Sequence, residues 1–119
     1  GGALFVERST EAIPGVLALI EDSAFKDARA AFEGGAVYVR NTVLQVRRSR
    51  FTGPRQEFQP NAQKGAFIHW EAFTDTGVTG EVRDSTFIGG IAGTTGGEAV
   101  SVTTSGTAPV KLVVRGSRF

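Results

Sequence analysis

The sequence predicts an all-β solenoid, and three observations support this prediction. A glycine-rich segment that contains an alanine and leads into an apolar run occurs four times in the 119 residues. A second signature, Ser-x-Phe, ends a β-rich run and also occurs four times. The dipeptides Asn-Gly and Asp-Gly, which close two-residue hairpins, do not occur. A repeat of about 20 to 50 residues without hairpin signals is typical of structural units that stack on one another.

The glycine-rich segments predict the first strand of each unit. Their alanines lie 33, 30 and 33 residues apart and are Ala3, Ala36, Ala66 and Ala99. The residues after each alanine alternate with the period of two that a half-buried strand shows. The expected inward positions are Leu4 and Val6, Val37 and Val39, Phe67 and His69, and Val100 and Val102. The outward positions are then Phe5, Tyr38, Ile68 and Ser101, with Trp70 one step further along.

The runs before each Ser-x-Phe motif predict the second strand of each unit. Their inward positions are mainly β-branched or apolar, namely Val16, Ala18, Ile20, Thr42, Leu44, Val46, Val78, Gly80, Val82, Val110, Leu112 and Val114. The intervening outward positions are mainly polar, namely Leu19, Glu21, Gln45, Arg47, Glu81, Arg83, Val113 and Arg115. This alternation again indicates a strand with one buried face.

The two predicted strands determine how the units pack. A unit of about 30 residues buries two short strands only against the equivalent strands of its neighbours, so the strands run parallel. We expect about four coils of 30–33 residues, with residues 1–119 as a single β-helix segment roughly 19 Å long. Stacked coils predict a row of serine hydroxyls and an aromatic ladder of Phe25, Phe51, Phe87 and Phe119. Helix formers over residues 25–33 predict one or two helical turns before Gly34.

Composition limits the classes of function. A formal net charge of +1 argues against a nucleic-acid binder. The chain has no cysteine, and its single histidine, His69, falls among inward valines, so we expect a buried neutral side chain, no metal site and no cofactor. No run of 18 apolar residues occurs, so no membrane span is expected. Neither end carries a polar or helical cap, which predicts that the segment is a fragment of a longer solenoid.

The Gly-Gly-Ala openings at residues 1–6 and 34–39, each followed by a β-rich run and a phenylalanine, resemble a known type of repeat. They are similar to the repeats of chlamydial polymorphic outer membrane proteins and of the wider pectin-lyase-like surface proteins. The resemblance implies a right-handed parallel β-helix. It also implies an extracellular or cell-surface location with an adhesive, structural or polysaccharide-processing role.

Two sets of charged residues are candidate sites. Each of the first three Ser-x-Phe motifs is preceded by a charged residue, namely Asp22, Arg48 and Asp84. Stacking of the repeats places these residues in one row. Acidic and basic groups on one outer face resemble the catalytic sites of polysaccharide lyases and hydrolases, whereas the simpler interpretation is a solvated face of alternating charges. Next to this row, Arg47, Arg83 and Arg115 share an outward position suited to an acidic glycan, although nearby acidic residues offset their charge.

A third candidate site is aromatic. Phe5, Tyr38 and Trp70 lie on or near the outward side of the first strands. A row of exposed rings indicates a sugar-stacking platform or a protein interface, unless a loop carrying Phe58 or Phe73 covers it. A register shift of one residue would instead turn these rings inward.

These patterns favour a structural or adhesive β-helix segment of a larger secreted or cell-surface protein. Because uncapped ends expose strand edges, the expected partners are flanking coils of the same parent chain or other copies stacked end to end. Such stacking would build a rod. The alternatives are a polysaccharide lyase or hydrolase that uses Asp22, Arg48 and Asp84, and a module that binds glycans.

Overall fold

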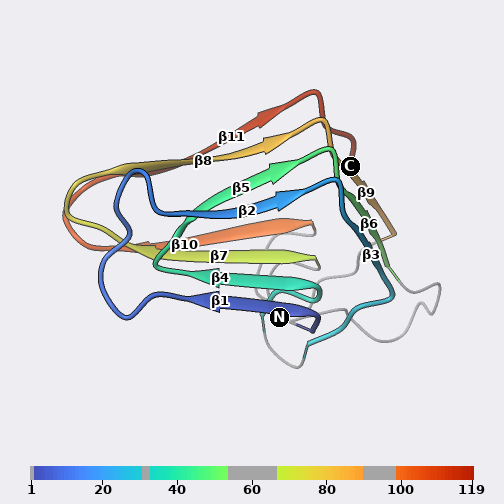
Figure 1. The fold of residues 1–119 in the computed structure, drawn as a ribbon, viewed down its shortest axis with the longest axis horizontal. Helices are drawn as coiled ribbons and strands as arrows, with labels where there is room; N and C mark the ends of the chain where they lie inside the picture. The colour runs from blue at the N-terminus through green and yellow to red at the C-terminus, as the bar shows by residue number, and fades with distance from the viewer. Residues whose placement is uncertain (1, 31–32, 54–66, 90–98) are drawn as a thin grey trace.

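The computed structural model describes residues 2–30, 33–53, 67–89 and 99–119. Within these residues the regular structure consists of β-strands, and every pair of neighbouring strands is parallel. The strands form three sheets that the chain visits in turn (Figure 1). Each of the four repeats contributes one strand to the first two sheets, and the first three repeats also contribute one strand to the third. The predicted all-β class and parallel pairing are therefore confirmed.

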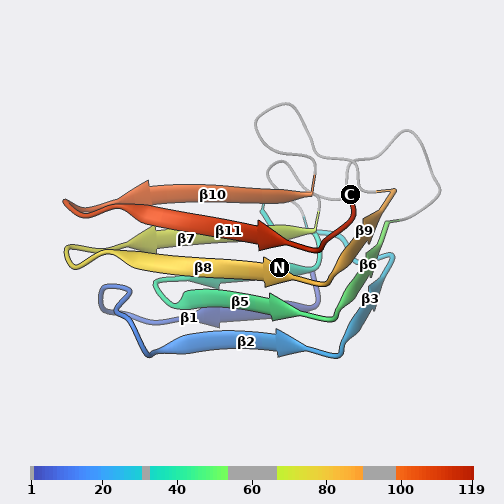
Figure 2. The same cartoon turned by 90° about the horizontal axis from the view of Figure 1, so that it is seen from above.

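The first sheet has the order β1-β4-β7-β10 and the second the order β2-β5-β8-β11. The first contains Leu4–Glu7 (β1), Val37–Arg40 (β4), Ile68–Phe73 (β7) and Val100–Ser105 (β10). The second contains Leu17–Glu21 (β2), Val43–Arg47 (β5), Val78–Arg83 (β8) and Val110–Arg115 (β11). The third is shorter, with Ala24–Lys26 (β3), Arg50–Thr52 (β6) and Thr86–Ile88 (β9). Figure 2 shows the three sheets from above.

The core lies where the inward faces of the three sheets meet. The strands of the middle repeats contribute most, because every second residue of β4 and β8 is buried, as predicted, and β5 buries Val43, Leu44 and Val46. Val16, which was expected to face inward, is exposed. The fully buried members include Val37, Val39, Leu44, Val46, Phe51, Ile68, Trp70, Ala72 and Val82. No helix in the described part of the chain has the length and apolarity that a membrane crossing requires.

A stacked aromatic ladder fills the corner beside the third sheet, as predicted. The ring centroids of Phe25 and Phe51 are 4.9 Å apart, those of Phe51 and Phe87 are 4.8 Å apart, and those of Phe87 and Phe119 are 4.9 Å apart. Their interplanar angles are 6°, 5° and 3°. The spacing matches the distance between neighbouring parallel strands, so the ladder follows directly from the strand register.

A row of serines connects the repeats at the bend between the second and third sheets. Ser23 N donates to Ser49 Oγ at 3.2 Å, Ser49 N donates to Ser85 Oγ at 3.1 Å, and Ser85 N donates to Ser117 Oγ at 3.1 Å. Each hydroxyl donates in turn to the carbonyl two residues earlier in its own repeat. The row therefore satisfies backbone donors that the sharp bend removes from the sheet ladders.

The residue before each of these serines adopts a left-handed backbone conformation. The φ angles are 50° for Asp22, 45° for Arg48, 51° for Asp84 and 56° for Gly116. Only Gly116 reaches this region without strain, because a side chain makes it unfavourable. The three charged side chains are thus placed at one corner by backbone geometry.

The third repeat departs from the predicted register by one residue. Phe67, rather than Ala66, takes the position of Ala36 and Ala99. Phe67 N donates to Ala99 O at 3.2 Å, and Ala36 N donates to Phe67 O at 2.8 Å. Its ring contacts the aromatic ladder, with centroids 6.0 Å from Phe51 and 5.9 Å from Phe87. The expected inward position of His69 was wrong as a result.

Trp70 shows the consequence of this shift. It pairs with Val39 and Val102 on the inward face and is fully buried, so its expected outward role in glycan binding was wrong. Its indole Nε1 donates to Thr42 O at 2.8 Å. Gly80 lies opposite, and a Cβ atom at Gly80 would come within 2.6 Å of the indole ring. The missing side chain of Gly80 makes room for this ring.

The predicted helical turns at residues 25–33 do not form in the described part of that stretch. Phe25 belongs to β3, and Asp27 ends this strand with a φ of 56°. The helix-forming composition is overridden because Phe25 gains a stacked partner in Phe51. Residues 31–32, and Phe58 as a possible cover for the aromatic row, lie outside the described residues.

Candidate functional site

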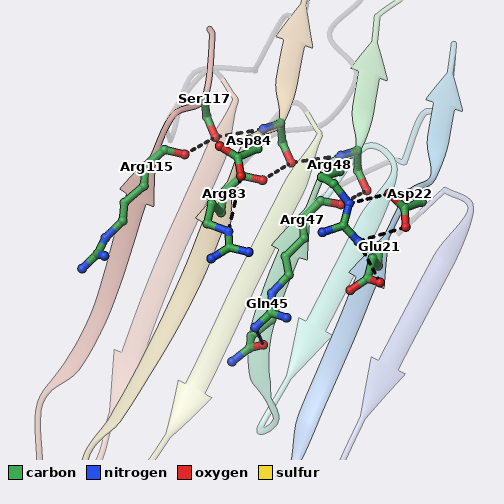
Figure 3. A network of polar contacts seen from close by, with 11 residues as sticks. Glu21, Asp22, Gln45, Arg47, Arg48, Arg83, Asp84, Arg115 and Ser117 are labelled. Carbon is green, nitrogen blue, oxygen red and sulfur yellow. Dashed lines mark hydrogen bonds and ion pairs between the residues drawn. The ribbon is translucent and has the colours of Figure 1, made fainter.

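The row of Asp22, Arg48 and Asp84 lies at the bend, but these residues do not converge on one point (Figure 3). Arg48 turns to the first repeat, where its Nε and Nη2 atoms donate to the two carboxylate oxygens of Asp22 at 2.7 and 3.0 Å. Its Nη2 also lies 2.9 Å from Glu21 Oε1. Asp84 instead has Arg83 as its partner, with Nε 3.4 Å from Oδ2.

The electrostatics of this row favour ion pairs over acid catalysis. The hydrogen bond from Arg48, with its charge, holds the pKa of Asp22 below the usual range despite an opposing effect of desolvation. A general acid at neutral pH needs the opposite shift, a raised pKa. The arrangement therefore matches the simpler interpretation, a solvated face on which opposite charges pair between repeats.

The predicted arginine row is present on the outward face of the second sheet. Arg47 pairs with Arg83 and Arg83 with Arg115 in the strand register (Figure 3). Arg47 Nη2 donates to Gln45 Oε1 at 2.9 Å. Within the described part of the chain, the buried Nε atom of Arg47 has no hydrogen-bond acceptor, and that of Arg83 has only the ion pair with Asp84 at 3.4 Å. Like charges in neighbouring strands repel one another, so an anion placed between them would relieve this cost.

A hollow of about 190 Å³ lies beside the arginine row. The lining residues come from β5, β8 and β11 and are Gln45, Thr79, Gly80, Glu81, Val113 and Arg115. The lining thus combines an amide, a hydroxyl, a carboxylate and a guanidinium. Such a set of donors and acceptors suits a hydroxylated ligand better than a simple anion, because Glu81 opposes a second negative charge.

The aromatic row is smaller than predicted. Phe5 is 51% exposed, and its ring centroid lies 5.1 Å from that of Tyr38, but the rings are inclined at 49°. Tyr38 is half-buried, and its hydroxyl donates to Glu71. With Trp70 in the core, the remaining pair does not provide the coplanar platform that sugar stacking uses. Phe73, which was a candidate to cover this row, is itself 41% exposed, and Phe5 remains accessible to solvent.

A polar cluster that the sequence pattern did not predict surrounds His69 on the outward face of the first sheet. His69 is fully buried there, in the same row as Tyr38 and Ser101. Its Nε2 atom lies 3.2 Å from Thr103 Oγ1 and 3.9 Å from Glu33 Oε2. A buried polar side chain on an outward strand position indicates that other parts of the protein cover this face.

Two carboxylates complete this cluster. Atoms of Glu33, His69 and Glu71 that are able to ligate a metal all lie within 4.8 Å of one another. Arg40 bridges neighbouring strands, with Nη1 3.3 Å from Glu7 Oε1 and Nε 3.5 Å from Glu71 Oε1. Burial, followed by the hydrogen bond and negative charge of Glu71, raises the pKa of the Tyr38 hydroxyl.

The sequence carried a weak signal for this cluster. Placing Ile68 and Trp70 inward would have put His69 and Glu71 together on the outward face. Glu33, by contrast, precedes the first sheet's second strand, and nothing in its spacing indicates that it reaches His69. Comparison with known proteins gives no further guide, because no family model, no curated protein and no solved structure matches the chain.

Proposed function

We propose that the chain is a segment of a right-handed parallel β-helix, with about four coils of 30–33 residues, and that it builds a rod in a larger protein. Three parallel sheets, which the first three repeats visit in the same order, support this architecture, and the fourth repeat extends two of them. The resemblance of the Gly-Gly-Ala openings to those of surface proteins supports a structural or adhesive role, secreted or at the cell surface. The partners are flanking coils of the parent chain or further copies.

The observation that carries the proposal is the apolar character of both ends of the sheets. At one edge, β2 exposes Leu17 and Leu19, with 46% and 51% of their surfaces accessible. At the other edge, Val114 is 45% exposed and Phe119, the last ring of the aromatic ladder, is 66% exposed. Exposed edges that combine free strand hydrogen-bonding groups with apolar side chains are sites for pairing with another strand.

The two edges are also complementary, which favours a second copy as the partner. Glu21 belongs to the same row as Arg115, through Arg47 and Arg83. Stacking one copy on another would continue this row and place Glu21 of one copy against Arg115 of its neighbour. Leu19 and Val113 likewise share a row, so an apolar pair would form beside this ion pair.

Charge reversal at the two edges tests this stacking. We expect the unaltered protein to form end-to-end multimers that grow with concentration, measured by light scattering and electron microscopy. Glu21→Arg and Arg115→Glu, each alone, place like charges across the contact and should weaken association about tenfold. A one-to-one mixture of the two variants, or the double variant, should recover it.

A matched control separates this effect from a general change in charge. Arg50→Glu reverses an exposed charge on β6, a strand that has neighbours on both sides. Association should be unchanged in this variant. A protein that stays monomeric at all concentrations, or single variants that associate normally, would refute end-to-end stacking.

The arginine row supports a second candidate function, binding of an acidic glycan beside the hollow on the second sheet. The buried Nε atom of Arg47, which has no acceptor among the described residues, favours it. Arg83→Gln should then weaken binding of an acidic oligosaccharide about tenfold, measured by calorimetry at low salt. Lys111→Gln removes a charge from the same face of β11 and should have a smaller effect. Equal losses in the two variants would indicate non-specific attraction.

A further inference from the structure

The cluster around His69 brings ligand types of one particular chemistry together. It contains one imidazole and two carboxylates, from Glu33 and Glu71, within 4.8 Å of one another. Imidazole nitrogen and carboxylate oxygen are the mixed ligand set of zinc and of similar first-row transition metals. The sulfur ligands of other zinc sites are not available, because the chain contains no cysteine.

The cluster places two carboxylates beside a buried imidazole. His69 is fully buried, and its Nε2 atom lies 3.9 Å from Oε2 of the half-buried Glu33. Arg40 contacts Glu71 on the side of Oε1. Carboxylates brought close together repel one another, and a divalent cation held between them would offset this repulsion.

The surroundings of Glu71 hold it in a suitable orientation. Tyr38 donates its hydroxyl hydrogen to Oε2 of Glu71, while Arg40 lies 3.5 Å from Oε1 on the other side of the carboxylate. Groups such as Tyr38 and Arg40, which contact a ligand from outside, fix its orientation and raise metal affinity. Thr103 Oγ1 instead lies 3.2 Å from Nε2 of His69, the ring nitrogen that faces Glu33. The sheet register places all of them, because Tyr38, His69 and Thr103 come from β4, β7 and β10.

We propose that Glu33, His69 and Glu71 bind a divalent transition-metal ion of the zinc type. Around a four-coordinate zinc ion, ligand atoms about 2.0–2.2 Å from the metal are about 3.3–3.6 Å apart. The candidate ligand atoms lie within 4.8 Å of one another, so metal binding requires the side chains to close by up to about 1.5 Å. Three protein ligands leave a fourth position for water or the Thr103 hydroxyl. The ion would tie the segment before β4 to the outward face of the first sheet.

The composition of the chain makes the experiment specific. His69 is the only histidine, and Trp70, the only tryptophan, follows it in the sequence. The untagged chain is titrated with Zn²⁺ by calorimetry, and with Co²⁺ while its absorption spectrum and the Trp70 fluorescence are recorded. We expect one site per chain, visible Co²⁺ bands of four- or five-coordinate geometry, and a higher melting temperature in Zn²⁺.

Substitutions then identify the ligands. His69→Gln should abolish the high-affinity site, and Glu33→Gln and Glu71→Gln should each weaken it by more than about tenfold. Glu81→Gln, a carboxylate variant on the second sheet, should bind as the unaltered chain does. Burial of His69 could prevent the His69→Gln variant from folding, which circular dichroism would detect. In that case Glu33→Gln and Glu71→Gln decide the question alone. Absence of Zn²⁺ binding, or equal binding in Glu33→Gln, Glu71→Gln and Glu81→Gln, would overturn the proposal.

Discussion

Replacing Phe51 by alanine is expected to lower the free energy of unfolding by about 3–5 kcal/mol, the largest effect of any single substitution considered. Phe51 is fully buried and stacks on Phe25 and Phe87, with centroids 4.9 and 4.8 Å away. Phe67 closes a third side at 6.0 Å. The substitution removes the ring contacts with Phe25 and Phe87. It also leaves a cavity, because the paired strands around it are not free to move inward.

Phe119 provides the matched control, because it occupies the end of the same ladder. Among the described residues it stacks on Phe87 alone, and it is 66% exposed, so Phe119→Ala should cost only about 1 kcal/mol. Urea unfolding followed by the fluorescence of buried Trp70 measures both variants. Equal costs at Phe51 and Phe119 would contradict the stabilisation expected from burial and stacking of Phe51.

Gly80→Ala is expected to destabilise the protein by about 1–3 kcal/mol although it adds a single methyl group. That methyl would lie 2.6 Å from Trp70 Cζ3 and 3.0 Å from Leu44 O. Neither the buried indole, fixed by its hydrogen bond to Thr42, nor the β5 backbone is free to move away. Alanine would otherwise be the better residue in a strand, since glycine loses more entropy on folding.

A double-mutant cycle separates this steric effect from other causes. Phenylalanine at position 70 lacks the outer ring atoms that the new methyl would meet. Gly80→Ala should therefore cost at least about 1 kcal/mol less in the Trp70→Phe background than in the unaltered chain. Urea unfolding followed by far-ultraviolet circular dichroism measures all four proteins. An identical cost in both backgrounds would contradict the proposed packing of Gly80 against Trp70.

The sequence was sufficient to predict the parallel sheets, the serine row and the aromatic ladder because each follows from repetition. A phenylalanine follows two residues after each of Ser23, Ser49, Ser85 and Ser117, so the pattern is supported by four independent occurrences. The first strand of the third repeat does not follow the pattern of the other three repeats, so its register could not be predicted by repetition. Phe67 takes the place that alanine has in the other repeats, and its ring is accommodated only because the aromatic ladder lies beside it.

The candidate site was less predictable because it depends on segments that do not repeat. Glu33 reaches His69 from the segment before β4, a contact that strand alternation does not encode. The one-residue shift at Phe67 also moved His69 from the expected inward side to the outward side, where Tyr38 and Glu71 lie. Likewise, the choice of Asp22 rather than Asp84 as partner of Arg48 depends on side-chain rotamers at the bend.

The serine row gives the molecule a direction. Each link runs the same way, from the amide of one repeat to the hydroxyl of the next, starting at Ser23 and finishing at Ser117. The Ser23 hydroxyl oxygen faces one end as an acceptor, and the Ser117 amide faces the other as a donor. Joining two like ends would oppose donor to donor or acceptor to acceptor. An assembly that extends this row is therefore a polar filament with two chemically different tips, which are free to grow and to be capped independently.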